Sequence, residues 1–416
     1  MKILLASLGT AGDVHPFLAI GRHLADCGHD VELLGSPAYA SLAAGAGIGF
    51  CGVGRAGDLE AALGHHYVWH PINGFGVLWR YLARPAMADT FNRIEAVFRA
   101  QPCVLLYSPF LMPAARIANE KLGVPAISAY TAPAMIRNHY PPVSIAHWQL
   151  PRWMPRALCK RAWELLDRRK MQPLALPAVE AMRHSLGLAP LRQSIFGDWI
   201  HAPERGITLF PDWFAPATPD WPAQIRQAGF PLYDGDAGGG LSRATRAFLA
   251  GGSAPLVFTA GSAMQQAREF FAAAVSAAKA LGERALLMSN AADQVPADLP
   301  GTVLHTRYEP YSLLLPAARA FIHHGGIGSS AQALRAGVPQ LVVPHAYDQF
   351  DNARRLEQLG VARILGGDAS ASRRLQRQLH ALLRASAVGT ACALAATRFQ
   401  GDRTLQTIQQ AIEEFA

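Results

Sequence analysis

The sequence predicts an α/β protein with two Rossmann-like, doubly wound domains. Its 416 residues exceed one domain at roughly 100–200 residues per domain. Half of the residues are hydrophobic and 16% are charged, which supplies apolar material for full cores and is unlike a disordered chain. Short apolar runs bounded by Gly, Pro or Asn alternate with longer helical patterns, as in βαβ units with a parallel sheet.

Nine apolar runs are predicted strands, and each is apolar on both faces, as expected when helices cover both sides of a sheet. The first half of the chain contains strands at 3–7, 31–35, 104–107 and 126–129, and the second half at 256–259, 285–288, 303–304, 320–323 and 340–343. A helix is predicted over 405–415, and the sequence leaves open which half it packs on.

A proline-rich stretch separates the two alternating patterns. Residues 211–222 contain four prolines, each of which lacks a backbone donor and disfavours helix in its predecessor. We therefore expect a first domain at 1–215, a connector at 216–235, a second domain at 236–395 and a terminal helix at 396–416. Two such domains are expected to leave a ligand-binding crevice that faces the carboxyl ends of both sheets.

The net charge and the cysteine content limit the classes of partner and the cell compartment that fit the sequence. The net charge of +8 leaves nucleic acid, a phosphorylated small molecule or an acidic membrane as anionic partners. The five cysteines are odd in number, lie far apart and form no C-x-x-C pair, which favours a reducing cytoplasm. We expect a cytoplasmic protein without signal peptide or membrane span, with peripheral contact at an inner membrane as an open alternative.

The most informative motif lies at 320–339. A strand ends at His323 or His324, glycines allow a tight turn, and a helix is predicted from Ser329. Free amides and the helix dipole at that N-terminus favour an anion, and His324 and the Ser329 hydroxyl can add donors, so a diphosphate fits. Alternatively, Ser329-x-x-Gln332 is only a capping box and the glycines serve packing.

A second polar group follows the next predicted strand. Asp348 and Gln349 come to the same sheet edge as the glycine motif and offer the acceptors and donors that sugar hydroxyls require. An exposed Asp-Gln pair that is merely solvated is the alternative.

These motifs together resemble the donor signature of inverting nucleotide-sugar glycosyltransferases with the GT-B fold, the UDP-glycosyltransferase-like family 1. The resemblance rests on His324-Gly325-Gly326-x-Gly328-Ser329, Ala336-Gly337-Val338-Pro339 and Asp348-Gln349-x-x-Asn352-Ala353. It implies that the His-Gly-Gly-x-Gly-Ser element contacts the donor diphosphate and that Asp348 and Gln349 contact the sugar. It also implies a phosphate contact at Ser262 and a nucleobase site at Tyr308 and Glu309, where the Tyr308 ring would stack on the base.

One position departs from this pattern. Many family members have a Glu that holds both ribose hydroxyls, whereas this chain has Gln332. This difference points to a ribose without its 2′-hydroxyl, and hence to a dTDP-sugar rather than a UDP-sugar. A capping role for Gln332 is the competing interpretation.

The first predicted strand leads into a second motif, Gly9-Thr10-Ala11-Gly12-Asp13-Val14-His15-Pro16. Pro16 is predicted to open a helix, so Asp13 would lie on a strand-to-helix turn. A dinucleotide site is disfavoured, because G-x-G-x-x-G is missing and Gly35-Ser36 stands where an acidic residue would end the second strand.

The motif instead looks like the Gly-x-x-Gly-Asp-Val-x-Pro element of bacterial and sterol glycosyltransferases, whose Asp is the general base. A carboxylate near the acceptor hydroxyl can take its proton during attack on the anomeric carbon. His15 is a competing candidate for the base and a candidate acceptor contact, or a histidine without a chemical role beside the helix start. A helix N-cap is the structural alternative for Asp13. No D-x-D pair lies near the donor motif, so we expect a metal-independent reaction without a cofactor, in which His324 and helix amides stabilise the leaving diphosphate.

Similarity to one subfamily extends over nearly the whole chain. Stretches at 75–79, 210–216, 220–222, 229–235 and 348–353 resemble the rhamnosyltransferase catalytic subunits of bacterial rhamnolipid biosynthesis. The resemblance implies transfer of L-rhamnose from dTDP-L-rhamnose to a 3-(3-hydroxyalkanoyloxy)alkanoate, giving mono-rhamnolipid, and association with the enzyme that makes this acceptor. Another dTDP- or UDP-sugar on a sterol, macrolide or other lipid remains the alternative, and a non-catalytic sugar-nucleotide binder is disfavoured.

Two further segments bear on the acceptor and on the charge. An apolar groove for a fatty acyl chain, or simply core, is predicted from Tyr67, Trp69, Phe75, Leu78, Trp79 and Tyr81. Residues 152–170 contain seven basic and two acidic residues among apolar ones, which indicates either a helix on an anionic membrane or a solvated helix face. Nucleic acid is not expected, because no recognition motif accompanies the charge.

Overall fold

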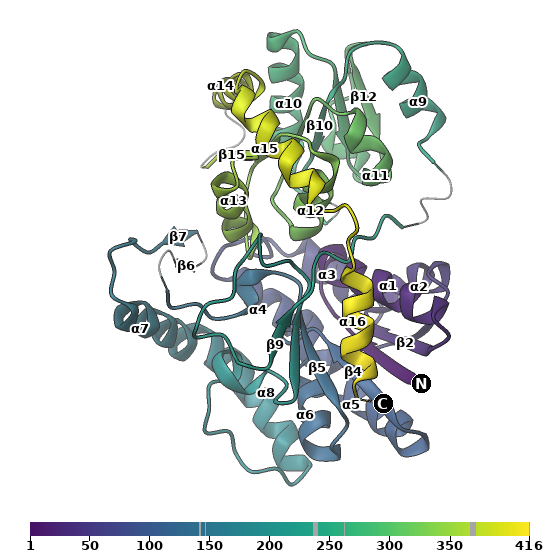
Figure 1. The fold of residues 1–416 in the computed structure, drawn as a ribbon, viewed down its shortest axis with the longest axis vertical. Helices are drawn as coiled ribbons and strands as arrows, with labels where there is room; N and C mark the ends of the chain where they lie inside the picture. Colours follow the sequence, from purple (N-terminus) through teal and green to yellow (C-terminus); the bar gives the residue numbers. More distant parts are fainter. Residues whose placement is uncertain (141–142, 146, 236–239, 262, 367–371, 416) are drawn as a thin grey trace. The chain divides into compact units, whose positions relative to one another are not determined.

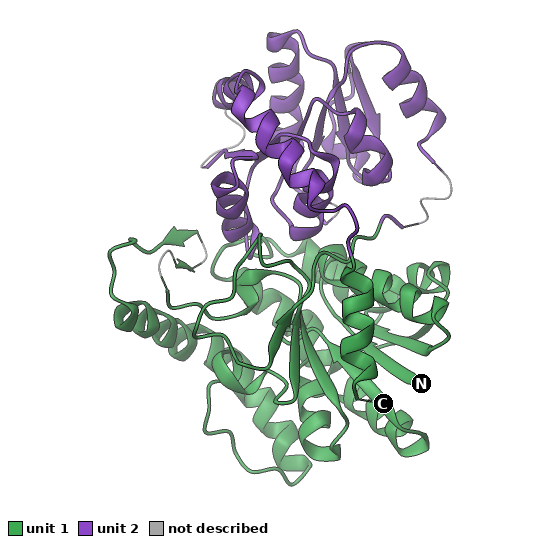
Figure 2. Ribbon diagram, viewed as in Figure 1, with its two compact units in different colours: residues 1–233, 403–416 green, residues 234–402 purple. Residues whose placement is uncertain are grey.

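The computed structural model describes residues 1–140, 143–145, 147–235, 240–261, 263–366 and 372–415. The chain divides into two compact units (Figure 2): unit 1 contains residues 1–233 and 403–416, and unit 2 contains residues 234–402. Each unit is a layered α/β structure around a parallel sheet (Figure 1), which confirms the predicted fold class.

Unit 1 is built on a seven-stranded sheet in the order β3-β2-β1-β4-β5-β8-β9, with every pair parallel. The order reverses beside β1, whose neighbours are β2 and β4, and loops at the carboxyl ends of strands at such a switch point form ligand sites in open α/β sheets. The strands are β1 (Lys2–Ala6), β2 (Asp30–Gly35), β3 (Gly49–Gly52), β4 (Cys103–Tyr107), β5 (Ala126–Tyr130), β8 (Arg205–Thr208) and β9 (Ile225–Gln227).

Helices and one small hairpin complete unit 1. The hairpin pairs β6 (Ser144–Ile145) with β7 (Trp148–Gln149). There are also three π-helical turns: Trp79–Ala83 joins α4 to α5, Asp167–Met171 joins α7 to α8, and Ile195–Trp199 lies between α8 and β8. The helices are α1 (Ala11–Asp26), α2 (Ala40–Gly45), α3 (Asp58–Gly64), α4 (Gly74–Leu78), α5 (Arg84–Ala100), α6 (Pro113–Leu122), α7 (Arg156–Leu166), α8 (Gln172–Ser185) and α16 (Thr404–Glu413).

Unit 2 has a six-stranded parallel sheet in the order β12-β11-β10-β13-β14-β15, whose order reverses beside β10. Its strands are β10 (Leu256–Thr259), β11 (Ala285–Met288), β12 (Val303–Thr306), β13 (Ala320–His323), β14 (Gln340–Val342) and β15 (Ala362–Ile364). Its helices are α9 (Arg243–Ala250), α10 (Arg268–Leu281), α11 (Tyr311–Leu314), α12 (Ile327–Ala336), α13 (Gln349–Gln358), α14 (Ser372–Leu383) and α15 (Ser386–Thr397).

Both faces of the second sheet are buried, as the doubly apolar strands predict. On one face Leu256 and Phe258 pack with the apolar sides of α10 and α14. On the other face Val257 and Phe321 pack with α11 and α12. Among the described residues no single helix is long and apolar enough to cross a membrane; α14 and α15 meet that criterion only as a pair bent by 70°.

The C-terminal helix α16 belongs to unit 1, a point that the sequence leaves open. Arg205 of β8 donates from Nη1 to the Ala411 carbonyl at 2.7 Å and forms an ion pair with Glu414 at 2.6 Å. From α1, His23 is hydrogen-bonded to Gln409 at 2.9 Å. Through these contacts the C-terminal helix packs on β8 and α1 of unit 1.

Four strands of the two sheets were not predicted: β3, β8, β9 and β15. Each has only three or four residues with glycines or polar side chains among the apolar ones, so none forms an apolar run. Strand β9 lies within residues 216–235, the range expected as a connector, and pairs with β8.

Two predicted helix starts are wrong. Helix α1 begins at Ala11 with Thr10 as its N-cap, so Pro16 lies inside the helix and Asp13 is not the cap. Helix α12 begins at Ile327 with Gly326 as its N-cap, so Ser329 and Gln332 do not form a capping box. In both cases the N-cap residue lies earlier in the chain than the proline or serine suggests, at Thr10 and at Gly326.

Candidate active site

The glycine turn between β13 and α12 forms a helix N-terminus without a capping side chain. Gly325 has a φ of +88°, and a Cβ there would lie 2.7 Å from Val342 Cγ1 and 3.1 Å from the Gln349 carbonyl oxygen, so only glycine fits. Gly326 caps the helix in extended conformation and can offer no side-chain acceptor to the first-turn amides. Gly328 is exposed, and a Cβ there would meet nothing within 4 Å. These amides are therefore placed to bind an anion.

His324 stands beside this helix N-terminus in a space made by two glycines. A Cβ at Gly261, which has a φ of +99°, would lie 2.8 Å from His324 Cε1, and a Cβ at Gly326 would lie 2.5 Å from its Nε2. Gly261 follows β10 and His324 follows β13, the two strands at the switch point of this sheet.

The His324 ring is neutral and incompletely hydrogen-bonded. Burial, followed by the nearby His323 and His345, lowers the pKa of His324 to about 3. Its Nδ1 is buried and has no hydrogen-bond partner among the described residues. A buried imidazole nitrogen without a partner is costly unless a ligand oxygen or water completes it.

The loop after β14 is hydrogen-bonded to the same glycine turn. Asn352 donates from Nδ2 to the Gly325 carbonyl at 3.0 Å and to Asp348 Oδ2 at 2.6 Å. The buried Gln349 side chain accepts from the backbone amides of His345 and Ala346 at 2.8 and 3.0 Å. The predicted sugar residues and the predicted diphosphate turn are thus brought together at one edge of the sheet.

Tyr308 and Glu309, adjacent in sequence, differ in exposure. The Tyr308 ring is 50% exposed and its hydroxyl donates to the Asp234 carbonyl at 2.8 Å. Glu309 is buried, and its carboxylate accepts from the Ser242 amide at 3.0 Å and from the hydroxyls of Thr245 and Thr306. Burial alone would raise the pKa of Glu309, but these hydrogen bonds outweigh it and lower the pKa. The Glu309 side chain is therefore hydrogen-bonded within unit 2 rather than exposed to a ligand.

Gln332 takes part in a polar network that sequence reasoning missed. Its Nε2 donates to Asp234 Oδ1 at 3.0 Å, and its Oε1 accepts from Arg335 Nη2 at 2.7 Å. Arg335 also forms an ion pair with Asp234 Oδ2 at 3.2 Å. Asp234 lies 98 residues before Gln332 along the chain, so no local pattern could have revealed the contact.

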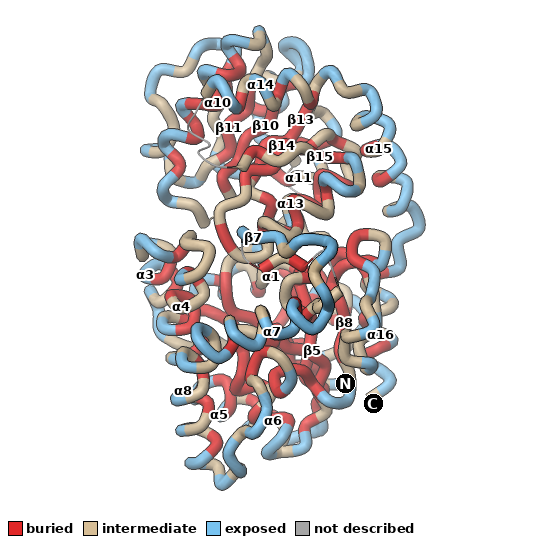
Figure 3. The backbone as a smooth tube through the Cα atoms, turned by 90° about the vertical axis from the view of Figure 1, so that its left-hand side faces the viewer, coloured by how far each residue is buried: buried red, intermediate tan, exposed pale blue. Residues whose placement is uncertain are grey.

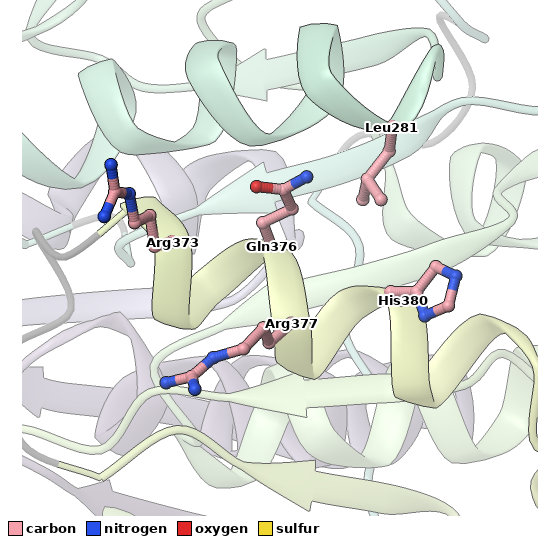
Figure 4. A pocket seen from close by; sticks show the side chains of 5 residues that line it. All are labelled: Leu281, Arg373, Gln376, Arg377 and His380. Atoms are coloured by element: carbon pink, nitrogen blue, oxygen red, sulfur yellow. The ribbon is translucent and has the colours of Figure 1, made fainter.

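Pockets are found at two places among the described residues of unit 2. One of about 370 Å³ adjoins the His324 ring through Gly261 and is lined at the carboxyl ends of β10 and β11 by Gly261, Met264, Gln265, Asn290, Ala291, Asp293 and Gln294. The sequence signal for Asn290, a polar residue just after a predicted strand, was overlooked. The other, of about 560 Å³, contains no predicted site residue and lies between α10 and α14 (Figure 4), lined by Leu281, Arg373, Gln376, Arg377 and His380.

Asp13 lies in the first turn of α1, directly beyond β1 at the switch point of the first sheet. Its Oδ2 accepts from the Thr10 amide at 2.8 Å and from the Thr10 hydroxyl at 3.2 Å. A Cβ at Gly9, whose φ is +130°, would lie 2.2 Å from this oxygen. Burial raises the pKa of Asp13 to about 6, although the Thr10 hydrogen bonds act in the opposite direction. The carboxylate is therefore a stronger base than an ordinary aspartate.

The aromatic acceptor candidates divide between core and surface. Trp79 is 1% exposed and packs edge-on against the fully buried Phe196, so its assignment to an acceptor wall is corrected to core. Phe75 is half-buried at the edge of the same cluster and contacts Phe110. His15 is half-buried and contacts the Tyr233 ring, with centroids 5.1 Å apart.

Ser262, the predicted phosphate contact, lies outside the described residues. Within the described ranges no group of three or more His, Cys, Asp or Glu side chains is arranged to hold a metal ion.

Comparisons with known proteins cover both halves of the chain. The glycosyltransferase family 28 N-terminal domain matches residues 3–141, and the erythromycin biosynthesis protein CIII-like C-terminal domain matches residues 276–414. Glycosyltransferase GtfE of Amycolatopsis orientalis is 30% identical over 373 residues, which cover 87% of this chain and 85% of that protein. O-mycaminosyltylonolide 6-deoxyallosyltransferase of Streptomyces fradiae is 29% identical over 386 residues, with coverage of 87% and 85%.

Solved structures share the fold at lower identity. The glycotransferase of kitacinnamycin has a TM-score of 0.74 at 21% identity and covers 99% of this chain and 98% of its own. The glycosyltransferase VinC in complex with dTDP has a TM-score of 0.70 at 18% identity, with coverage of 100% and 99%. These likenesses establish a GT-B architecture for the two α/β units.

Proposed function

The chain belongs to the GT-B nucleotide-sugar glycosyltransferases with a family 28 N-terminal domain and an erythromycin CIII-like C-terminal domain, and from this premise we propose that it transfers a sugar from a dTDP-sugar to a hydroxyl of a hydrophobic acceptor, with inversion. The observation that carries the proposal is the glycine turn of unit 2, where an uncapped helix N-terminus adjoins the His324 ring, whose Nδ1 has no hydrogen-bond partner among the residues that the structure describes. Both features are completed by phosphate oxygens.

The donor diphosphate would lie on this turn. The first-turn amides of α12 and the neutral His324 ring would hydrogen-bond to its oxygens, and the helix dipole would favour the negative charge that grows as the sugar departs. Asp348 and Gln349, on the adjoining loop, would orient the sugar. The reaction is proposed to proceed without a metal, since these groups supply the stabilisation that a cation provides elsewhere.

A deoxyribose nucleoside is supported by Gln332. Both ends of its amide are engaged, by Asp234 and by Arg335, so it is poorly suited to hold two ribose hydroxyls. The solved structure of VinC contains dTDP, which agrees with the same donor class. L-rhamnose is the proposed sugar, by resemblance to the rhamnosyltransferases.

Asp13 is the proposed general base. The acceptor O–H proton passes to the Asp13 carboxylate as the acceptor oxygen attacks the anomeric carbon from the face opposite the leaving group. A new C–O glycosidic bond forms, the bond between the anomeric carbon and the phosphate oxygen breaks, and dTDP leaves with the electron pair. A base with a pKa of about 6 is largely ionised at neutral pH and still accepts a proton readily.

For the acceptor, the relatives favour a macrolide or similar natural-product alcohol over the rhamnolipid precursor. The Streptomyces fradiae relative is named for a tylonolide acceptor. The hydroxyalkanoyloxyalkanoate is the second candidate, proposed from the resemblance of residues 210–216 and 229–235 to the rhamnosyltransferases of rhamnolipid biosynthesis. Both acceptors are hydrophobic alcohols, and the candidate wall residues that are not buried are Tyr67, Trp69, Phe75 and Tyr81.

The test is a matrix of purified donors and acceptors. Donors are dTDP-L-rhamnose, dTDP-glucose and UDP-glucose, and acceptors are a macrolide aglycone and a hydroxydecanoyloxydecanoate, with products identified by mass spectrometry and anomeric configuration by NMR. Transfer from a dTDP-sugar with inversion is expected. Transfer from UDP-glucose alone would refute the donor assignment, retention would refute the mechanism, and the productive acceptor decides between the two acceptor classes.

A further inference from the structure

Residues 148–170 of unit 1, here termed the basic segment, expose an unusual share of large apolar side chains. In the described parts of the chain nine large hydrophobic residues are exposed, and four of them lie here: Trp148 (53%), Trp153 (79%), Leu158 (45%) and Leu165 (53%). Helix α7 lies at the periphery of unit 1, beside the β6–β7 hairpin (Figure 1). Its backbone is largely in the exposed class in Figure 3.

The same segment has a strongly positive surface. Its two acidic residues differ, because Glu164 is exposed whereas Asp167 is buried and paired with Arg137. All seven basic residues are exposed: Arg152, Arg156, Lys160, Arg161, Arg168, Arg169 and Lys170. The surface therefore carries seven cations against one carboxylate.

The inner face of α7 is held by the rest of unit 1. Cys159 is fully buried with Val143 of the hairpin region. Trp163 donates from Nε1 to the Asn138 carbonyl at 3.0 Å, and the Arg137 guanidinium lies 4.0 Å from the Trp163 ring centroid. With this side fixed, the opposite side is presented to solvent in a constant orientation.

The outer face has the spacing of an amphipathic surface helix. Leu158, Arg161 and Leu165 are separated by three and four residues, which places them on one face. Large apolar residues that are exposed singly are common on ordinary surfaces, whereas in the basic segment four are gathered with seven cations. Helices that lie in a bilayer interface combine such apolar residues with Lys and Arg and with tryptophan at the head-group level.

We propose that the basic segment docks the protein on an anionic lipid surface. Trp153, Leu158 and Leu165 enter the head-group and upper acyl region, and the basic side chains reach the lipid phosphates. A bilayer is favoured over nucleic acid because phosphate binding alone gives no role to the exposed leucines. This inference concerns where the enzyme works and stands apart from the proposed transfer reaction.

The experiment is co-sedimentation of the full chain with vesicles of phosphatidylcholine alone, or with roughly one third phosphatidylglycerol. We expect binding to the anionic vesicles only, weakening as salt rises. Each exposed cation near such a surface contributes about 5-fold in partitioning, so Arg161→Gln/Arg168→Gln/Arg169→Gln is expected to bind about 100-fold more weakly. The pair Trp153→Ala/Leu165→Ala is expected to lose about 10-fold at unchanged charge.

A matched control removes three exposed charges from unit 2, Arg373→Gln/Arg374→Gln/Arg377→Gln, and should bind vesicles like the parent. All variants should retain dTDP affinity by calorimetric titration, which reports folding of unit 2, and the circular dichroism of the parent. The proposal is overturned if the control variant loses as much as the segment variant, if the Trp153→Ala/Leu165→Ala variant binds normally, or if a single-stranded oligonucleotide is bound while anionic vesicles are not. Failure of the parent to bind dTDP would instead count against the proposed function.

Discussion

Replacing Asp13 with asparagine tests separately what this half-buried carboxylate contributes to catalysis and to stability. The amide side chain introduced by Asp13→Asn can still accept from the Thr10 amide through its oxygen, so the first turn of α1 keeps its capping contact. What is lost is the ability to take a proton. Because general base catalysis contributes about 10²- to 10⁴-fold, kcat is expected to fall by that factor while dTDP affinity is unchanged.

The pH dependence of activity should follow the ionisation of Asp13. Only the ionised carboxylate accepts the acceptor proton, so kcat/KM should rise with pH and level off above the pKa of about 6. Because an imidazole titrates in the same range, His15→Gln is compared with Asp13→Asn. The His15→Gln variant is expected to keep the fall in kcat/KM at low pH. Asp26→Asn, at the exposed far end of the same helix, makes the same chemical change as a control and should be fully active.

Stability should change in the opposite direction to activity. Asp13 titrates at about 6 in the folded protein against 3.8 ordinarily, so between these values the folded state holds a proton that the unfolded chain has released. Its contribution to stability is therefore full below pH 3.8 and is lost as pH rises through 6. The difference of about 2 pH units corresponds to about 3 kcal/mol.

Chemical denaturation as a function of pH measures this contribution of Asp13 to the free energy of unfolding. At pH 7 the Asp13→Asn variant is expected to be more stable than the parent by up to about 3 kcal/mol, and near pH 4 the two should be alike. A variant that keeps more than a tenth of the parental kcat/KM would remove Asp13 as the base. A variant of equal stability at both pH values would refute the assignment of a raised pKa.

Three further predictions test unit 2. Gly325→Ala should destabilise the protein by about 2 kcal/mol or more, because the positive φ of this residue disfavours a side chain. Gly328→Ala should leave the free energy of unfolding unchanged or raise it, and should weaken dTDP binding at least 10-fold by occupying the anion site. Glu309→Gln should lower the free energy of unfolding by about 1–3 kcal/mol and raise KM for the donor more than it lowers kcat, because it loosens the loop of the adjacent aromatic ring. The rings of His323 and His324 are neutral, with pKa values lowered to about 4 and about 3. As pH falls below 6.5, each should reduce the stability by up to about 1.4 kcal/mol per pH unit, because the unfolded chain takes up protons that the folded protein does not. A free energy of unfolding that stays level from pH 7 to pH 5 in denaturant titrations would contradict this.

The sheet strands show which parts of the fold are encoded locally. The strands predicted at 256–259, 285–288 and 320–323 are observed at the same residues, because central strands of a doubly covered sheet are buried on both faces and must be apolar throughout. Strand β9 lacks this burial at the sheet edge, and its Ile-Arg-Gln sequence gives no such signal.

The predicted site residues follow the same division. His324, Gly325 and Gly328 were identified because a strand, a glycine turn and a helix N-terminus are consecutive in the chain, and their capacity to bind an anion depends on backbone geometry alone. The structure places His324 and Gly325 in the turn beside the switch point of the sheet, whereas Gly328 lies in the first turn of α12, which begins earlier than predicted.

What the sequence alone determined was the fold class, the principal strands and the residue types at the two strand-to-helix turns, since each depends on hydrophobic pattern and backbone preference over a few neighbouring residues. Tertiary structure alone decided that Trp79 lies in the core, that the Glu309 carboxylate is hydrogen-bonded within unit 2, and that Gln332 is hydrogen-bonded to Asp234. It also decided that Asp13 has a raised pKa. Desolvation and hydrogen bonding depend on groups brought together from distant parts of the chain, and no local pattern records those groups.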